Sequence, residues 1–381
     1  MIAKAEVVII GAGVVGTSIA YHLAKKGCTD VLVLEKDSIG DGSTAKCAGG
    51  IRQQFSTEIN IRLAMESVRF FQNFTEETGH TPDFKQNGYL ILATTDQEVE
   101  AFRQNVAQQK SLGLEVNLLS PEGAKEMSPQ LNSDDISGAS YCSSDGFADP
   151  YQVTHGFASA ARKLGVRIQE GTEVIALNLK SGRVRGVVTN KGEIAANTVV
   201  NAAGPYAAEI GKMAGVEIPV TPSRRHIFFT TPLSQISAAA PMVIDFHTGF
   251  WFRRESQGLM LGMRNPEELP GFDISVDWDF LPRLAKISSH RLPLLNESGI
   301  VRGWAGLHAD TPDWHAIMGK VPGVEGLICA VGFSGHGFMH SPATGRLIAE
   351  LILEGSTSID ISPLALERFS GRTCPEEKIF I

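Results

Sequence analysis

Three glycines near the N-terminus have the spacing of a site that binds the pyrophosphate of a dinucleotide. The apolar stretch 7–10 leads directly into Gly11, Gly13 and Gly16. In such a turn the first glycine permits the tight bend, the second lets the main chain approach the phosphates, and the third lets the next helix pack on the strand. The N-terminus of that helix adds unpaired N–H groups and a partial positive charge. The chemistry predicted here is therefore phosphate binding by main-chain groups.

An acidic residue completes the pattern. A second apolar strand is predicted over 31–34, and it leads into Glu35 and Lys36. A carboxylate at the tip of that strand can accept hydrogen bonds from the hydroxyls of a ribose. A glycine-rich turn also occurs in ordinary α/β domains, and this alternative stays open. The order of strand, turn, helix, strand and acid favours a bound dinucleotide.

Length and composition indicate a globular protein large enough for two domains. The chain has 381 residues, of which 43% are hydrophobic and 20% charged, and a formal net charge of −8. This charge, without any basic block, gives no support for nucleic-acid binding. No stretch predicts a signal peptide or a membrane span. The five cysteines are scattered and lack metal-ligand spacing, so we expect no disulfide framework, no metal site and a cytoplasmic protein.

The elements that must position these residues follow from periodicity and turn residues. Apolar residues at helical spacing predict helices over 14–26, 58–78, 97–112 and 342–353. Asp149 followed by Pro150 predicts a capped helix that ends near Gly165. Short apolar runs predict strands over 89–93, 116–119, 174–179, 184–188, 198–204 and 327–331. The stretch 219–306, rich in β-branched, aromatic and proline residues, predicts a second sheet.

These elements predict an α/β fold in which one domain is assembled from separated segments. The nucleotide-binding domain is predicted over 1–85, 146–218 and 320–381. The two insertions, 86–145 and 219–319, are predicted to combine into a substrate domain with a mainly antiparallel sheet. A strand followed by glycines occurs again at 327–337, near the far end of the chain, so this junction is expected to return to the cofactor.

The number of glycine-rich segments favours a flavin over a nicotinamide. Such segments lie around Gly11, over 42–50, at Gly204 and over 332–337. The main chain must approach the large isoalloxazine ring along an edge and a face, and residues without side chains permit this. A nicotinamide enzyme needs one such segment. The nicotinamide alternative would be excluded by a yellow colour of the pure protein.

The chain resembles the FAD-dependent D-amino-acid oxidase and sarcosine oxidase superfamily over nearly its whole length. The resemblance rests on five stretches: VVIIGAGVVG, GDGSTAKCAGGIRQQF, NAAGPYAA, WAGLHADTPD and AVGFSGHGF. Within the superfamily, the chain is most similar to β subunits of hetero-oligomeric sarcosine oxidase and proline dehydrogenase. The resemblance implies a Rossmann-type (GR2-like) FAD-binding domain and a small amino-acid substrate. It also implies either a partner subunit or a homo-oligomer.

The resemblance implies a set of residues around FAD. Gly11, Gly13 and Gly16 would hold the pyrophosphate, and Glu35 with Lys36 the adenosine ribose. Ser43 and Thr44 would bond the phosphates, and Val174 would present its main chain to the adenine. The remaining members of the set would approach the flavin itself: Gly49, Gly50, Ala203, Gly204, Gly332, Gly335, His336, Gly337, Phe338 and Met339. The helix that starts within 335–339 would point N–H groups at the pyrimidine edge of the flavin and raise its reduction potential.

The resemblance also implies the reaction. In this family a hydride passes from the substrate α-carbon to flavin N5, and the imine hydrolyses in water. The protein must bind the amino acid as a free amine and orient it, and an arginine fork matches the two oxygens of its carboxylate. Arg52 occupies the position of the carboxylate arginine of sarcosine oxidases. A surface arginine, or one that binds phosphate, is the alternative at this position.

Some family positions that attach the flavin or activate oxygen carry different residues here. The histidine and cysteine used for covalent flavin attachment fall at Lys46 and about Ala305, so we expect dissociable FAD. The lysine that activates oxygen falls at Met260. Without a fixed cation beside the flavin, a dehydrogenase is favoured over an oxidase.

The substrate positions differ as well. Met339 replaces a lysine that binds carboxylate, and His308 replaces the arginine of glycine and D-amino-acid oxidases. Arg264 could supply the missing positive charge. For His336 a flavin-side hydrogen bond or packing is favoured over a role as base, and His340 could line the pocket or be structural.

Three readings of the function stay open. The leading one is oxidation of a small secondary or N-methyl amino acid, such as sarcosine or proline. A glycine or D-amino-acid oxidase is the second, and a flavoprotein subunit that needs a partner chain for turnover is the third. The resemblance also leaves open a second flavin, FMN, at a subunit interface. The segment 146–149 has no histidine for its covalent attachment.

Overall fold

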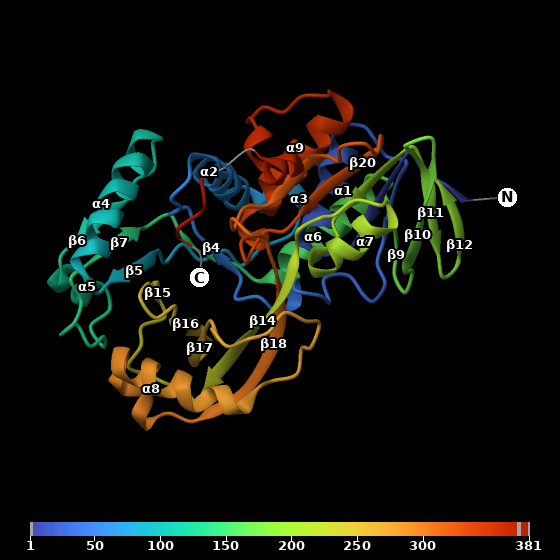
Figure 1. Ribbon diagram of the computed structural model, residues 1–381. Coiled ribbons are helices and arrows are strands. Elements are labelled where there is room, and N and C mark those ends of the chain that lie inside the picture. The colour runs from blue at the N-terminus through green and yellow to red at the C-terminus, as the bar shows by residue number, and fades with distance from the viewer. Residues whose placement is uncertain (1–2, 372–374, 380–381) are drawn as a thin grey trace.

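A six-stranded sheet forms the frame of the nucleotide-binding half. The structure is a computed structural model that describes residues 3–371 and 375–379 (Figure 1). The strand order is β19-β20-β13-β2-β3-β9. The strands are β2 (Val7–Ile10), β3 (Val31–Leu34), β9 (Arg167–Gln169), β13 (Thr198–Asn201), β19 (Ile317–Lys320) and β20 (Leu327–Val331). All neighbouring pairs are parallel except β19 with β20. The central strands are buried along their length, as expected for a sheet covered on both faces.

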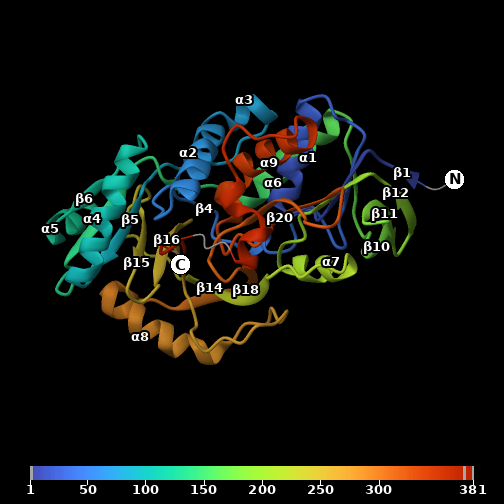
Figure 2. The ribbon, with the colours of Figure 1, turned by 45° about the horizontal axis from the view of Figure 1, so that its top comes forward.

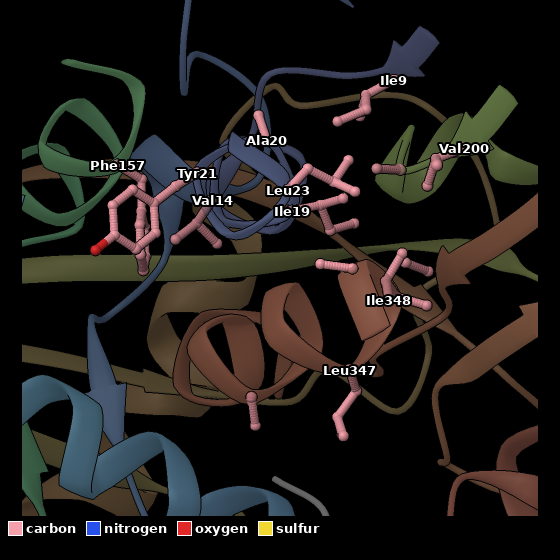
Figure 3. Packing of buried hydrophobic residues seen from close by; sticks show 14 of the residues in the cluster. Ile9, Val14, Ile19, Ala20, Tyr21, Leu23, Phe157, Val200, Leu347 and Ile348 are labelled. Atoms are coloured by element: carbon pink, nitrogen blue, oxygen red, sulfur yellow. The ribbon is translucent and has the colours of Figure 1, made fainter. Parts of the chain in front are cut away.

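Helices cover one face of this sheet. Helices α1 (Val14–Lys25), α6 (Pro150–Lys163) and α9 (Gly337–Leu353) contact its strands, and α2 (Glu58–Gln72) and α3 (Phe74–Thr78) pack on α9 and α6. Figure 3 shows Ile19 and Leu23 of α1 between Val200 of β13 and Ile348 of α9, with Tyr21 against Phe157 of α6. Segments from the two ends of the chain thus share one hydrophobic core.

The other face carries a second apolar cluster. A four-stranded sheet lies there, in the order β1-β12-β11-β10, with α7 (Ala207–Met213) beside β10. Its strands are β1 (Ala3–Lys4), β10 (Val174–Lys180), β11 (Arg183–Thr189) and β12 (Gly192–Ala195). It forms the green edge near the N-terminus in Figures 1 and 2.

An eight-stranded sheet forms the other half of the molecule. Its order is β18-β14-β17-β16-β15-β5-β7-β6, and every pair is antiparallel except β15 with β5. The strands are β5 (Tyr89–Ala93), β6 (Asn117–Leu119), β7 (Gly138–Cys142), β14 (Thr221–Thr230), β15 (Met242–Asp245), β16 (Trp251–Glu255), β17 (Gly258–Met263) and β18 (Ile300–Asp310). The helices α4 (Asp96–Ser111), α5 (Pro121–Met127) and α8 (Leu281–Arg291) belong to this half, which lies to the left and below in Figure 1. The short pair β4 (Gly50–Ile51) and β8 (Gly146–Phe147) lies at the junction.

The predicted α/β class with a mainly antiparallel second sheet is confirmed, and several predicted elements need correction. The helix predicted over 58–78 is broken at Asn73 into α2 and α3. The helices α5 and α8 were not predicted. The helix predicted to begin at Pro342 begins at Gly337, with the proline inside it. Asp149 caps α6 as predicted, since its carboxylate accepts the N–H groups of Tyr151 and Gln152.

Candidate active site

The six-stranded and the eight-stranded sheet line one cavity of about 740 Å³. Its walls include the residues that follow the carboxyl ends of β2, β3, β13 and β20, where open parallel sheets bind ligands. Strands β14 to β18 supply the opposite wall. Of the predicted cofactor residues, the following line this cavity: Gly11, Gly13, Glu35, Lys36, Ser43, Thr44, Gly49, Gly50, Val174, Ala203, Gly204, Gly332, Gly335, His336, Gly337, Phe338 and Met339. Gly16 lies behind them, where it packs α1 against Gly11.

The turn after β2 forms a cradle that side chains would fill. Gly11 has a φ of +104°, and a Cβ there would lie 2.5 Å from the carbonyl oxygen of Ala202. A Cβ on Gly16 would collide with the carbonyl of Gly11. Helix α1 starts directly after Gly13, so its first N–H groups face the cavity. The cradle therefore presents main-chain donors to an anionic group.

Three side-chain groups beside the cradle are already oriented by the protein. The carboxylate of Glu35 accepts the N–H of Ala12 at 2.8 Å and the N–H of Asp37 at 3.0 Å. The hydroxyl oxygen of Thr44 accepts the N–H of Val14 at 3.2 Å, which leaves its proton available to a phosphate. Ser43 donates to the carbonyl of Leu307 at 2.6 Å, so its oxygen can act only as an acceptor toward a ligand.

The start of α9 forms a second main-chain site in the cavity. Gly337, Phe338 and Met339 occupy the first turn of this helix and line the wall. A Cβ on Gly335 would lie 2.6 Å from Cε1 of His308, so the imidazole packs directly on this turn. The first turn of α9 therefore points its N–H groups and the positive end of the helix dipole at a ligand bound in this part of the cavity. That is the feature predicted for the pyrimidine edge of the flavin.

Arg52 lies buried on the cavity wall, with 2% of its surface exposed. Its guanidinium donates to the carbonyls of Gln54 at 2.7 Å and Ile379 at 2.9 Å, and it lies over the ring of Phe55 at 4.3 Å. One terminal nitrogen is 3.4 Å from Nε2 of His336. Burial lowers the pKa of Arg52, and the nearby carboxylate of Glu377 opposes that shift. The arginine is therefore held in one orientation by main-chain carbonyls.

Three histidines in or behind the cavity wall have lowered pKa values. Burial, followed by the charge of Arg52, holds the pKa of His336 well below its ordinary value. Burial lowers the pKa of His340 to about 3, and burial with Arg225 and Arg264 lowers that of His308. His336 and His308 line the cavity, whereas His340 packs behind them against the ring of Phe55. Neutral imidazoles can accept a hydrogen bond from a substrate amine.

Sequence reasoning missed a charged pair on the opposite wall. Arg225 of β14 lines the cavity and donates to Asp310 of β18 at 3.1 Å, and 12% of each side chain is exposed. Nδ1 of His308 is 3.8 Å from this carboxylate. Arg264, predicted as an extra positive charge, also lines the cavity and lies over the ring of Trp314 at 5.0 Å. Arg225 had no signal in the sequence beyond its place in a predicted strand.

A buried carboxylate behind Arg52 was also missed. Asp145 accepts the N–H of Gln53 at 2.8 Å, the side-chain amide of Gln53 at 3.1 Å and that of Gln54 at 2.9 Å. Burial raises the pKa of Asp145 to about 6, against the effect of these hydrogen bonds. Because Gln54 supplies a carbonyl to Arg52, this cluster fixes the strand end that carries the arginine. The polar Gln53-Gln54 pair was the available signal, since glutamines that follow a buried strand need partners.

Met260, predicted on the substrate side, does not line the cavity. It is buried in a small cluster with Ile227 and Phe229, against which Ala48 and Trp251 pack. Cys47 lines the cavity, and burial raises the pKa of its thiol to about 11. Within residues 3–371 and 375–379, no group of three or more His, Cys, Asp or Glu side chains is placed to hold a metal ion. No helix in that part of the chain is long and apolar enough to cross a membrane.

The cavity fits FAD. The Gly11 cradle and the start of α1 suit a pyrophosphate, the oriented carboxylate of Glu35 suits a ribose, and the start of α9 suits the polar edge of a flavin ring. At Gly50, a side chain would run into the hydroxyl of Tyr89, so the main chain itself forms the wall there. These features lie along one continuous cavity that ends at Arg52 and Arg225.

Known proteins are similar to this chain both in sequence and in fold. Residues 6–351 match the family model of FAD-dependent oxidoreductases, DAO. Human mitochondrial dimethylglycine dehydrogenase is 33% identical over 97% of the chain, which spans 45% of that protein's length.

Two solved structures superpose along almost their whole length. L-Proline dehydrogenase from P. horikoshii is 38% identical, with a TM-score of 0.91, and the match covers 97% of this chain and 99% of that one. Glycine oxidase from Geobacillus kaustophilus is 28% identical, with a TM-score of 0.86 and coverage of 96% and 99%. The match of the family model over most of the chain is decisive: this chain belongs to the DAO family of FAD-dependent oxidoreductases.

Proposed function

We propose that this chain oxidises the C–N bond of a small secondary or N-methyl amino acid, with sarcosine- and proline-like amines as the substrate class. The observation that carries the proposal is Arg52, a buried guanidinium on the cavity wall beside the neutral imidazole of His336. Bound FAD supplies the oxidant, which takes a hydride from the carbon next to the amine nitrogen, and the imine then hydrolyses in water.

The residues around the cavity orient the substrate. Arg52 binds the carboxylate through charge-assisted hydrogen bonds, which fixes the position of the amine. His336 is neutral because it is buried beside that arginine, so it adds no second positive charge and can accept a hydrogen bond from the substrate amine. Arg225 and Arg264 add positive charge to the opposite wall, where Asp310 partly offsets it. Trp251 of β16 gives that wall apolar surface, and Phe338 at the start of α9 adds apolar surface on the facing side.

The similar proteins support this substrate class by their names: dimethylglycine dehydrogenase acts on an N-methyl amino acid and L-proline dehydrogenase on a cyclic secondary one. Met260 replaces the lysine that activates oxygen in related oxidases, and this replacement supports a dehydrogenase over an oxidase. We further propose that FAD is held without a covalent bond, because Lys46 and Ala305 cannot supply the attachments used in this family. Segments 1–85, 146–218 and 320–381 would carry the cofactor, and 86–145 with 219–319 the substrate.

A dye-reduction assay tests the proposal. The FAD-loaded protein is mixed with a redox dye and, in turn, sarcosine, dimethylglycine, L-proline, glycine and D-alanine, and formaldehyde is measured alongside. Reduction of the dye by a secondary or N-methyl amino acid, with formaldehyde released from the N-methyl ones and slow oxygen uptake, is the expected result. Fast oxygen uptake with glycine or D-alanine alone would contradict it.

A glycine or D-amino-acid oxidase is the second candidate, because the fold of glycine oxidase superposes with a TM-score of 0.86. The replacement of the family arginine by His308 weighs against it. If yellow protein reduces the dye with no amine of the set, a missing partner subunit becomes the better account. Copurification of a second polypeptide from the native host would then identify that partner.

A further inference from the structure

The last described residues of the chain contact the candidate substrate arginine. We call residues 375–379 the C-terminal strap; they follow the stretch 6–351 that matches the family. The strap lies between the two halves of the molecule in both ribbon views (Figures 1 and 2). The carbonyl of its Ile379 accepts a hydrogen bond from Arg52 at 2.9 Å. Residues 327 positions apart in the chain therefore meet at the cavity wall.

Glu377 anchors the strap through a fully buried carboxylate. Its surface exposure is 0%. One carboxylate oxygen accepts the N–H of Ser56 at 2.8 Å, the hydroxyl of Ser56 at 2.6 Å and the N–H of Ile379 at 3.0 Å. The other accepts the hydroxyl of Thr57 at 2.7 Å and the amide of Asn60 at 2.9 Å. Five donors are thus arranged around one carboxylate, which is a built site for this side chain.

Further main-chain contacts fix the path of the strap. The N–H of Lys378 donates to the hydroxyl of Ser56 at 2.8 Å, and the N–H of Glu377 donates to the carbonyl of Asp313 at 3.2 Å. Nε2 of His315 is 2.8 Å from the carbonyl oxygen of Pro375. The side chain of Ile379 is buried in an apolar cluster with Tyr89 and Met242, both of which line the cavity.

We propose that Glu377 is a positioning residue for substrate binding: by anchoring the C-terminal strap, it holds the Ile379 carbonyl against Arg52 and so presets the guanidinium for the carboxylate of the substrate. This inference rests on the proposed function, because it takes Arg52 as the carboxylate ligand. An arginine fixed before the substrate arrives loses little conformational freedom on binding, which strengthens the complex. The negative charge of Glu377 also stabilises the buried cation.

Binding of propionate to the FAD-loaded full chain tests this role. Propionate has a carboxylate but no amine to oxidise, and its binding is followed through the visible absorbance of the flavin. In Glu377→Ala we expect the dissociation constant to rise roughly tenfold or more, because the strap loses its anchor. In Glu377→Gln we expect a smaller rise, about threefold, because the amide oxygen can keep three of the five hydrogen bonds while the NH2 group cannot accept the other two. Glu376→Gln, at the exposed neighbouring residue, is the matched control.

A second variant keeps the test decisive if Glu377→Ala does not fold. Ser56→Ala removes the hydroxyl that links Glu377 and Lys378, and propionate should bind roughly threefold more weakly or worse. Unchanged binding in both variants would overturn the proposal. Tighter binding in either would also overturn it, since the Ile379 carbonyl would then compete with the carboxylate. If propionate fails to bind the wild type, neither Arg52 nor the strap has the role given to it.

The outcomes separate this inference from the proposed function. Propionate binding that depends on both Arg52 and Glu377, in a protein that no amino acid reduces, would support the strap and contradict the proposed reaction. Reduction by a secondary amino acid, with unchanged propionate binding in Glu377→Ala, would support the proposed reaction and contradict the role given to the strap.

Discussion

His340 is a buried imidazole that the folded protein keeps neutral, and this gives stability a measurable dependence on pH. Its exposure is 1%, its Nε2 has no hydrogen-bond partner within the described residues, and its ring packs against Phe55 at 5.0 Å. Burial, then Arg52 and His315, lowers its pKa to about 3, whereas the unfolded chain protonates near the ordinary value of 6.5. Between these two values the unfolded chain binds a proton that the folded chain does not. Stability is therefore lost as the pH falls below about 6.5.

The size of the effect follows from the two pKa values. Between pH 7 and pH 5, this histidine alone should lower the free energy of unfolding by about 2 kcal/mol. His340→Phe keeps a ring beside Phe55 and removes the titrating group. The drop in unfolding free energy between pH 7 and pH 5 should thus be about 2 kcal/mol smaller in the variant than in the wild type. His22 contributes to the remaining drop, because burial lowers its pKa to about 4.

Urea denaturation at both pH values, with FAD at saturating concentration, measures this difference. The comparison uses the change with pH, so a constant packing cost of the phenylalanine cancels. His290→Gln, at an exposed position, controls for the loss of one histidine. An identical drop in His340→Phe and in the wild type would refute the argument that His340 is neutral because it is buried.

Three further predictions concern the site. Arg52→Met should slow anaerobic flavin reduction roughly 100-fold or more, because two charge-assisted hydrogen bonds to the substrate are worth about 1.5 kcal/mol or more each; stopped-flow absorbance measures it, and a loss below about tenfold would count against the clamp. Met260→Lys would place an ammonium behind Ala48 and Trp251, which line the cavity, and should speed the reoxidation of reduced protein by oxygen because a cation close to the flavin stabilises developing superoxide; an unchanged rate constant in stopped-flow mixing would contradict this. Acid precipitation should release the yellow colour into the supernatant, and colour that stays in the pellet would show a covalent flavin.

The cofactor end of the cavity was predictable because its signals are local. The turn at Gly11 and the acid at Glu35 lie within one βαβ unit, and neighbouring main-chain atoms leave no room for a side chain at Gly11 and Gly16. Asp149 and Pro150 predicted the start of α6, again from residues adjacent in the sequence. The start of α9 was placed too late because Pro342 suggested a first turn. In the structure the hydroxyl of Ser341 donates to the carbonyl of Phe338, the acceptor that the proline nitrogen cannot use.

The substrate end depends on contacts between distant segments, and local patterns do not report these. Asp145 meets Gln53 across 92 positions, and Ile379 meets Arg52 across 327. A buried Glu377 or Arg225 has the same appearance in a sequence as a charge at the surface. The helix α8 was missed for another reason. Its apolar residues at helical spacing were present, but they lay within a stretch dominated by strand-forming residues.

The central claim is that this flavoprotein oxidises a small secondary or N-methyl amino acid. An anaerobic titration of the purified, FAD-loaded protein with sarcosine, dimethylglycine, L-proline, glycine and D-alanine tests it most directly, with the visible absorbance of the flavin as the readout. The account predicts that at least one of the first three amines bleaches the flavin, while glycine and D-alanine do not. Yellow protein that none of the first three bleaches would contradict it.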